Sequence, residues 1–222
     1  MKNPRATMWF EIVIIFAFMG SALFLSAGTI NYWQAWVYLG EVTISSIPLT
    51  VAMIKDPQLL ESRTKTVVER RPIQRIIVLC AGLSSIATLI VPGIDHRFSW
   101  SSMPFWLSIA GNLLIIASLW LVYLVFKENS FGSATVEISK DQTVVSTGPY
   151  AIVRNPMYAS AAVYFIGTSL ALGSYWGLIP SVLAILCFVW RLFDEEKLLV
   201  QNLPGYREYC AKVRWHLIPG IF

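Results

Sequence analysis

Charged side chains are scarce in this sequence. Only 14% of its 222 residues are Asp, Glu, Lys or Arg, whereas 56% are hydrophobic. Soluble proteins contain about 25% charged residues, so the composition excludes a soluble domain and favours a protein whose solvent is the lipid bilayer. The net charge is only +4 at pH 7. A charge this small does not indicate nucleic acid binding, and it is explained by membrane topology.

Residues that bind metals or form disulfides are also few. Cys80, Cys187 and Cys210 show no Cys-x-x-Cys spacing, and the first two lie inside apolar runs. His96 and His216 are far apart in the sequence and belong to no metal-ligand motif. We therefore expect no disulfide framework and no metal site, and we interpret both histidines as surface or capping residues. A Gly-x-Gly-x-x-Gly turn after a strand is missing as well, so no Rossmann nucleotide site is expected.

Long apolar runs dominate what is present. A transmembrane helix needs about 20 apolar residues, and the sequence contains about six such runs. Because backbone polar groups must be satisfied within lipid, each run is expected to be helical. The fold class predicted is an all-α integral membrane protein. We expect its first run to be a span and not a cleaved signal peptide. The predicted spans are 8–27, 33–54, 73–91, 103–126, 157–172 and 176–193.

Positive residues alternate between the loops. They precede the first run, follow the second, fourth and sixth runs, and are represented in the other loops only by Arg97. Since Lys and Arg are retained on the cytoplasmic side, we predict a multi-pass protein with both termini cytoplasmic. It would lie in the plasma or inner membrane of a prokaryote, or in the endoplasmic reticulum of a eukaryote. The cationic loop 55–75 is interpreted as an interfacial amphipathic segment.

Polar chemistry is concentrated in the second half of the chain. We divide the chain into a four-span region, 1–126, and a C-terminal region, 127–222, with two spans, a polar loop and a tail. In the first region Glu41 lies well inside a predicted span, where a carboxylate is costly and suggests function. A functional role and a purely structural carboxyl group are equally open for it.

Two prolines frame the segment before the fifth span. Pro149 and Pro156 favour extended geometry in the residues that precede them, which predicts a tight, non-helical path from Gly148 into the span. This path fixes Arg154 near a helix N-terminus, where unsatisfied N–H groups attract anions. Arg154 is then either part of a carboxylate or phosphate receptor or an arginine that reaches lipid headgroups.

Three consecutive acids follow the sixth span, Asp194, Glu195 and Glu196. The C-terminal end of a helix disfavours such charge unless the helix continues, so a cationic partner is expected nearby. Arg191 can supply it through an i,i+4 pair with Glu195. Alternatively, one carboxylate recognises a cationic ligand group such as an ammonium.

Together these segments resemble the isoprenylcysteine carboxyl methyltransferase and phospholipid N-methyltransferase superfamily. The resemblance covers roughly residues 128–222 and implies an integral membrane enzyme that uses S-adenosylmethionine. Its pocket would be non-Rossmann, cytoplasmic and built from the C-terminal spans and tail, and its lipophilic substrate would enter from the bilayer. The motifs that carry the resemblance are Gly148-Pro149-Tyr150, Val153-Arg154-x-Pro156-x-Tyr158, Glu195-Glu196-x-x-Leu199, Pro204-Gly205-Tyr206-x-x-Tyr209 and Ile218-Pro219.

The resemblance also implies roles for individual residues. Arg154, Glu195 and Glu196 are the catalytic candidates. Many members have His where this chain has Asn155, and since Asn cannot titrate near neutral pH, a general-base role is excluded there while cofactor positioning remains. The cofactor-binding candidates are Gly148, Tyr150, Val153, Arg154, Asn155, Pro156, Tyr158, Glu195, Glu196, Tyr206 and Tyr209.

The methyl acceptor and two other functions stay open at this point. A prenylcysteine carboxylate needs no base, whereas a lipid amine or a thiol needs one, for which Glu195 or Glu196 is the candidate. An NADPH-dependent, sterol-reductase-like enzyme would require more clustered arginine than Arg154 and Arg191 provide. A transporter or scaffold would favour inverted repeats, and we see none.

Overall fold

The structure is a computed structural model, and it describes residues 4–56, 59–60, 72–129 and 143–222. Within these ranges the secondary structure is helical, without strands. The predicted amphipathic segment 55–75 lies mostly outside the described residues.

Six long helices coincide with the six apolar runs, which confirms that each run is helical. Three of them, α2, α4 and α5, are long and apolar enough to cross a membrane. The apolar part of α1 is shorter, Ile12–Ala27, and α6 has 16 residues. The helices are α1 (Pro4–Ala27), α2 (Trp33–Lys55), α4 (Pro72–Phe98), α5 (Phe105–Glu128), α6 (Pro156–Ala171) and α7 (Leu178–Asn202).

Two helices extend beyond the predicted ends of their spans. We expected the third span to end at Val91, but α4 continues through Pro92 to Phe98. The sixth was expected to end at Phe193, but α7 continues to Asn202. The acidic triplet 194–196 is therefore inside a helix and not at its C-terminus, so the unfavourable helix end that we expected there is absent.

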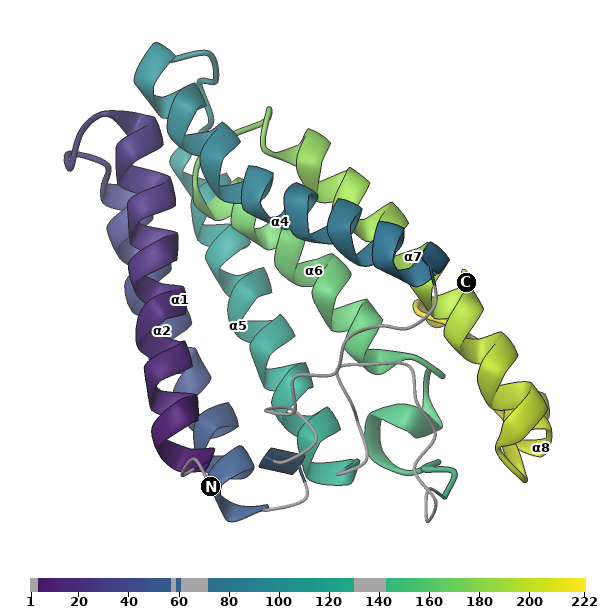
Figure 1. The fold of residues 1–222 in the computed structure, drawn as a ribbon. Helices are drawn as coiled ribbons and strands as arrows, with labels where there is room; N and C mark the ends of the chain where they lie inside the picture. Colours follow the sequence, from purple (N-terminus) through teal and green to yellow (C-terminus); the bar gives the residue numbers. More distant parts are fainter. Residues whose placement is uncertain (1–3, 57–58, 61–71, 130–142) are drawn as a thin grey trace.

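The helices pack side by side in an up-and-down arrangement (Figure 1). α1 packs on α2 and α4, α5 packs on α2 and α6, and α7 packs on α4 and α6. The loops 28–32, 99–104 and 172–177 lie at one end of the bundle, the upper end in Figure 1. Two short elements, the 3₁₀ helix η1 (Gly148–Ala151) and the helix α8 (Tyr206–Lys212), lie toward the other end.

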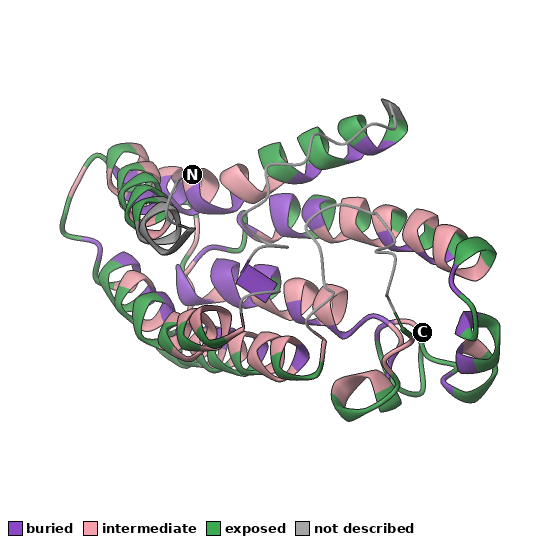
Figure 2. Ribbon diagram, turned by 60° about the horizontal axis from the view of Figure 1, so that its bottom comes forward, coloured by how far each residue is buried: buried purple, intermediate pink, exposed green. Residues whose placement is uncertain are grey.

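The outer surface of the bundle is apolar. Buried residues face neighbouring helices, and exposed residues cover the outer sides (Figure 2). Large side chains such as Leu25, Leu79 and Trp106 are exposed there. A surface of this kind is suited to lipid contact, because lipid tails solvate exposed apolar side chains without the penalty that water imposes.

Glycine permits a close contact between α5 and α6. Where α5 crosses α6, a Cβ atom on Gly111 would lie 2.3 Å from the backbone nitrogen of Ala171 and 2.8 Å from the carbonyl oxygen of Gly167. The obstacle is backbone, so a side chain here would force the two helices apart. Small residues commonly allow such close packing between helices in membranes.

We expect Gly111→Ala to destabilise the protein, since overpacking against backbone costs about 1–3 kcal/mol. In a thermal unfolding experiment in detergent, the midpoint should fall by roughly 3–10 °C. Gly82→Ala is the matched control, because a Cβ on Gly82 of α4 meets no atom within 4 Å. Equal midpoints for the two variants would contradict the described packing of α5 on α6.

Candidate functional site

The segment leading into α6 is fixed by its local sequence. Gly148 has φ +56°, and a Cβ there would lie 2.6 Å from Cγ of Glu128, so glycine suits this position both for its backbone and for its lack of a side chain. The chain then forms η1, whereas we had expected a wholly non-helical path. Pro156 occupies the first turn of α6, where its missing N–H costs no helical hydrogen bond.

A backbone contact brings the C-terminal tail against this segment. The N–H of Arg154 donates to the carbonyl of Trp215 at 2.9 Å, and the N–H of Asn155 donates to the carbonyl of His216 at 3.1 Å. Two consecutive backbone bonds hold residues 154–155 beside residues 215–216. The tail therefore reaches the N-terminal end of α6.

Arg154 and Glu196 form a largely buried ion pair between this segment and α7. Nε of Arg154 donates to Oε1 of Glu196 at 3.0 Å, and Nη2 donates to Oε2 at 3.3 Å. The two side chains are only 10% and 11% exposed. Paired N–H donors facing both oxygens of a carboxylate give a charge-assisted, orientation-specific contact.

Asn155 completes the shell around the Glu196 carboxylate. Its Nδ2 donates to Oε1 of Glu196 at 2.6 Å, and the residue is 8% exposed. Placed directly before Pro156, this amide binds the same oxygen as Nε of Arg154. The positioning role left open for Asn155 is thus consistent with its contacts.

His216 joins the same group of side chains. Its Nδ1 lies 3.0 Å from Oε2 of Glu196, and both ring nitrogens lie 2.6 Å from Nη2 of Arg154. The interpretation of His216 as an isolated surface or capping residue is therefore wrong. No local motif marks this histidine, because its partners lie 20 and 62 positions away in the sequence.

A second polar contact joins α6 to α7 next to the ion pair. The hydroxyl of Tyr158 donates to Oε2 of Glu195 at 2.6 Å. The preceding acid, Asp194, accepts a hydrogen bond from the side-chain amide of Gln74 on α4. Neighbouring carboxylates on α7 thus face different partners, and Glu196 is the one that faces Arg154.

Tyrosines of α8 cover the site from the tail side. The hydroxyl of Tyr209 donates to the carbonyl of Tyr150 in η1 at 2.7 Å. Tyr206 is 5% exposed; burial raises the pKa of its hydroxyl, and the negative charge of Glu196 raises it further. Burial likewise raises the pKa of the Cys210 thiol, although Arg154 acts in the opposite direction. These groups stay protonated and help exclude water from the ion pair.

Most residues singled out from the sequence converge here, but some do not. Val153 is buried beside Arg154, while Gly148 acts through its backbone. Glu41 lies elsewhere, on α2, where its Oε1 is buried without a hydrogen-bond partner among the described residues. Those residues include no group of three or more His, Cys, Asp or Glu side chains arranged to hold a metal.

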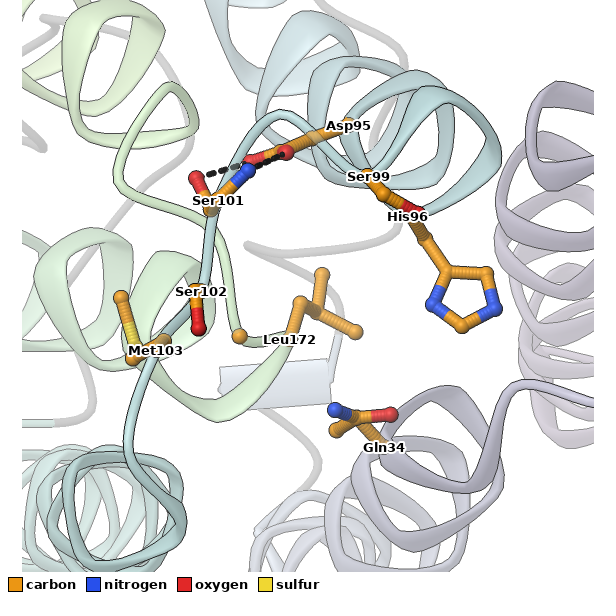
Figure 3. Close-up of a pocket in the computed structure, with 9 residues that line it drawn as sticks. Gln34, Asp95, His96, Ser99, Ser101, Ser102, Met103 and Leu172 are labelled. Carbon is orange, nitrogen blue, oxygen red and sulfur yellow. Dashed lines mark hydrogen bonds between the residues drawn. The ribbon is translucent and has the colours of Figure 1, made fainter.

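A polar pocket of about 220 Å³ lies at the other end of the bundle. Figure 3 shows Gln34 and His96 on one side of it and Ser101 on another. Its carboxylate, Asp95, is 2% exposed and accepts hydrogen bonds from the backbone and hydroxyl of Ser101 and from the hydroxyl of Ser174. These bonds tie the loops of that end together.

Three helices long and apolar enough to cross a membrane, together with an apolar outer surface, indicate a membrane protein. Residues 106–204 match the phospholipid methyltransferase family, which belongs to the integral membrane methyltransferase superfamily that includes isoprenylcysteine carboxyl methyltransferases. The resemblance inferred from the motifs is thereby confirmed. The match spans α5 to α7 and contains Arg154, Asn155 and Glu196. No curated protein matches the chain.

The hydrogen bonds to the Glu196 carboxylate predict how a second carboxylate beside it would change the stability of the protein. We expect Asn155→Asp to lower stability at pH 8 by about 1–3 kcal/mol, since it replaces a donor by an acceptor. Two adjacent carboxylates cannot both stay ionised, so the folded state takes up a proton, and its stability relative to wild type should recover as the pH falls.

The measurement is the thermal unfolding midpoint in detergent at pH 8.0 and 5.5. Asn202→Asp is the control, because Asn202 is exposed and bonds only to its own helix, at the carbonyl of Leu198. A deficit of Asn155→Asp that is the same at both pH values would count against the contact between Asn155 and Glu196.

Proposed function

We propose that this protein is an S-adenosylmethionine-dependent methyltransferase that acts on a lipophilic acceptor at the membrane. The observation that carries the proposal is the buried Arg154–Glu196 pair at the N-terminal end of α6, inside the segment that matches a methyltransferase family. We further propose that six helices span the bilayer with both termini on the cytoplasmic side, in agreement with the charge alternation of the loops.

The residues present suit the amino acid end of this cofactor. That end carries a carboxylate and an ammonium, and the site offers one guanidinium and one carboxylate close together. Nε and Nη2 of Arg154 bind Glu196, whereas Nη1 makes a long bond, 3.5 Å, to the carbonyl of Val213, so Nη1 is the nitrogen that would turn to a ligand carboxylate. The positive end of the α6 dipole favours the same ligand group. Glu196, or its neighbour Glu195, would receive the ammonium.

When bound, the cofactor supplies an electrophilic methyl group on a sulfonium. The chain contributes orientation and exclusion of water. Glu196 and Asn155 hold the Arg154 guanidinium in place, and Tyr206 and Tyr209 of α8 close the tail side. A carboxylate acceptor would react without a base. For an amine or thiol acceptor, Glu195 or Glu196 would take the proton.

The acceptor is proposed to be membrane-soluble, because the bundle presents an apolar surface on its outer sides. A prenylated cysteine carboxylate, a phospholipid amine and a lipophilic thiol all fit this description. The name of the matching family favours a phospholipid amine, but nothing else separates the three acceptor classes, so an assay must do so.

The binding proposal predicts the behaviour of two variants in calorimetric titrations of S-adenosylhomocysteine into detergent-purified protein. Arg154→Ala and Glu196→Gln should each raise the dissociation constant about tenfold or more, since each removes a hydrogen bond to a charged group. Arg97→Ala and Glu208→Gln are matched controls, because both residues are exposed and lie outside the site.

Folding of each variant is checked by its thermal unfolding midpoint. NADPH, titrated into the wild type, tests the reductase alternative. Binding of NADPH without binding of S-adenosylhomocysteine would overturn the methyltransferase proposal, and so would folded wild-type protein that binds neither ligand.

The acceptor proposal predicts where a labelled methyl group goes. With protein reconstituted in vesicles and labelled S-adenosylmethionine, we expect label to enter an organic extract when the vesicles contain phosphatidylethanolamine, a farnesylated cysteine or a long-chain thiol. The acceptor that is labelled identifies the class, and Arg154→Ala should abolish the signal. Methylation of only short, water-soluble analogues would refute a membrane-soluble acceptor.

A further inference from the structure

His216 lies between the two charged groups of the proposed cofactor site and contacts both. Backbone bonding of residues 215–216 to residues 154–155 fixes its position, and aromatic rings flank it. Phe222 stacks on the imidazole at a centroid distance of 5.1 Å, and Phe193 of α7 meets it edge-on at 5.6 Å. The ring thus has a defined orientation and little room to turn.

The contacts of the ring assign its protonation state. Glu196 can only accept hydrogen bonds and Arg154 can only donate them. Nη2 of Arg154 lies 2.6 Å from both ring nitrogens, so the contact with Glu196 decides: Nδ1, 3.0 Å from Oε2, carries the hydrogen, and Nε2 is then the nitrogen with a lone pair for Nη2. One neutral tautomer satisfies both neighbours.

We propose that neutral His216 is a positioning residue that holds Arg154 for ligand binding, and that protonation of His216 makes the site sensitive to pH. The ligand part of this proposal rests on the proposed function. A proton on Nε2 removes the acceptor for Nη2 and places an N–H against the guanidinium. Arg154 then loses one of its two side-chain anchors, while the imidazolium competes with a ligand ammonium for Glu196.

The surroundings of the ring favour this behaviour. Among the described residues, the charged groups within hydrogen-bond distance of the His216 ring are Arg154, from the segment before α6, and Glu196, from α7. From α8, Tyr206 and Cys210 lie close enough to interact electrostatically with that pair, and both are neutral. The His216 side chain is 24% exposed, so water can reach the ring.

The test is a calorimetric titration of S-adenosylhomocysteine into the full chain at pH 8.0 and pH 5.5. Wild type should bind about tenfold more weakly at pH 5.5, the loss expected for one hydrogen bond to a charged group. His216→Gln should bind less tightly than wild type at pH 8.0 and change by less than about twofold between the two pH values. His96→Gln is the matched control, since His96 is the only other histidine and lies at the opposite end of the bundle, and it should behave like wild type.

The outcomes separate this inference from the proposed function. Wild-type binding that is equal at both pH values, or a His216→Gln variant that keeps the full pH effect, overturns the role of His216 and leaves the methyltransferase proposal standing. Folded wild type that binds no ligand overturns the proposed function. In that case imidazole nitrogen NMR decides the local claim: we expect the Nδ1–H tautomer for His216 at pH 8.0, and the Nε2–H tautomer would refute it.

Discussion

The site depends on one ion pair, Arg154 with Glu196, buried where the bundle meets its tail. Removing two charges from water is expensive, and their attraction offsets the cost only when further hydrogen bonds complete the geometry. Asn155 and His216 supply those bonds to Glu196. Three separate segments must therefore meet at one point: the residues before α6, the second half of α7 and the chain after α8. Such an arrangement is a poor means of gaining stability, which is consistent with the ligand-binding role that we propose for it.

The helices follow directly from the sequence, because an apolar run in lipid has few conformations other than a helix. Their ends do not. The third span was expected to end at Val91, yet α4 continues through Pro92 to Phe98, as expected where leaving backbone groups unpaired costs more than one missing hydrogen bond. The charges at 194–196 end the apolar run of α7 but not its helix, since Glu, Lys, Leu and Gln all favour helix.

The sequence motifs identified most residues of the site, but they did not show which side chain pairs with which. Arg154 could have faced lipid headgroups, and Glu195 could have taken the place of Glu196, because neighbouring positions on a helix point in different directions and only packing decides between them. His216 was missed altogether. A single histidine in a tail carries no periodic or spacing signal, and its position follows from two backbone bonds between segments about 60 residues apart.

The tail that follows α7 lies beyond the segment that matches the family. The match ends at residue 204, before Tyr206, Tyr209 and His216. Glu196 lies on α7, whereas Arg154 lies before α6 and is held beside the tail by the backbone bonds of residues 154–155 to residues 215–216. The tail covers the pair with tyrosine hydroxyls that stay protonated and adds His216. Under the role that we propose for His216, the group that makes the site respond to pH lies outside the segment that matches the family, whereas Arg154 and Glu196 lie inside it.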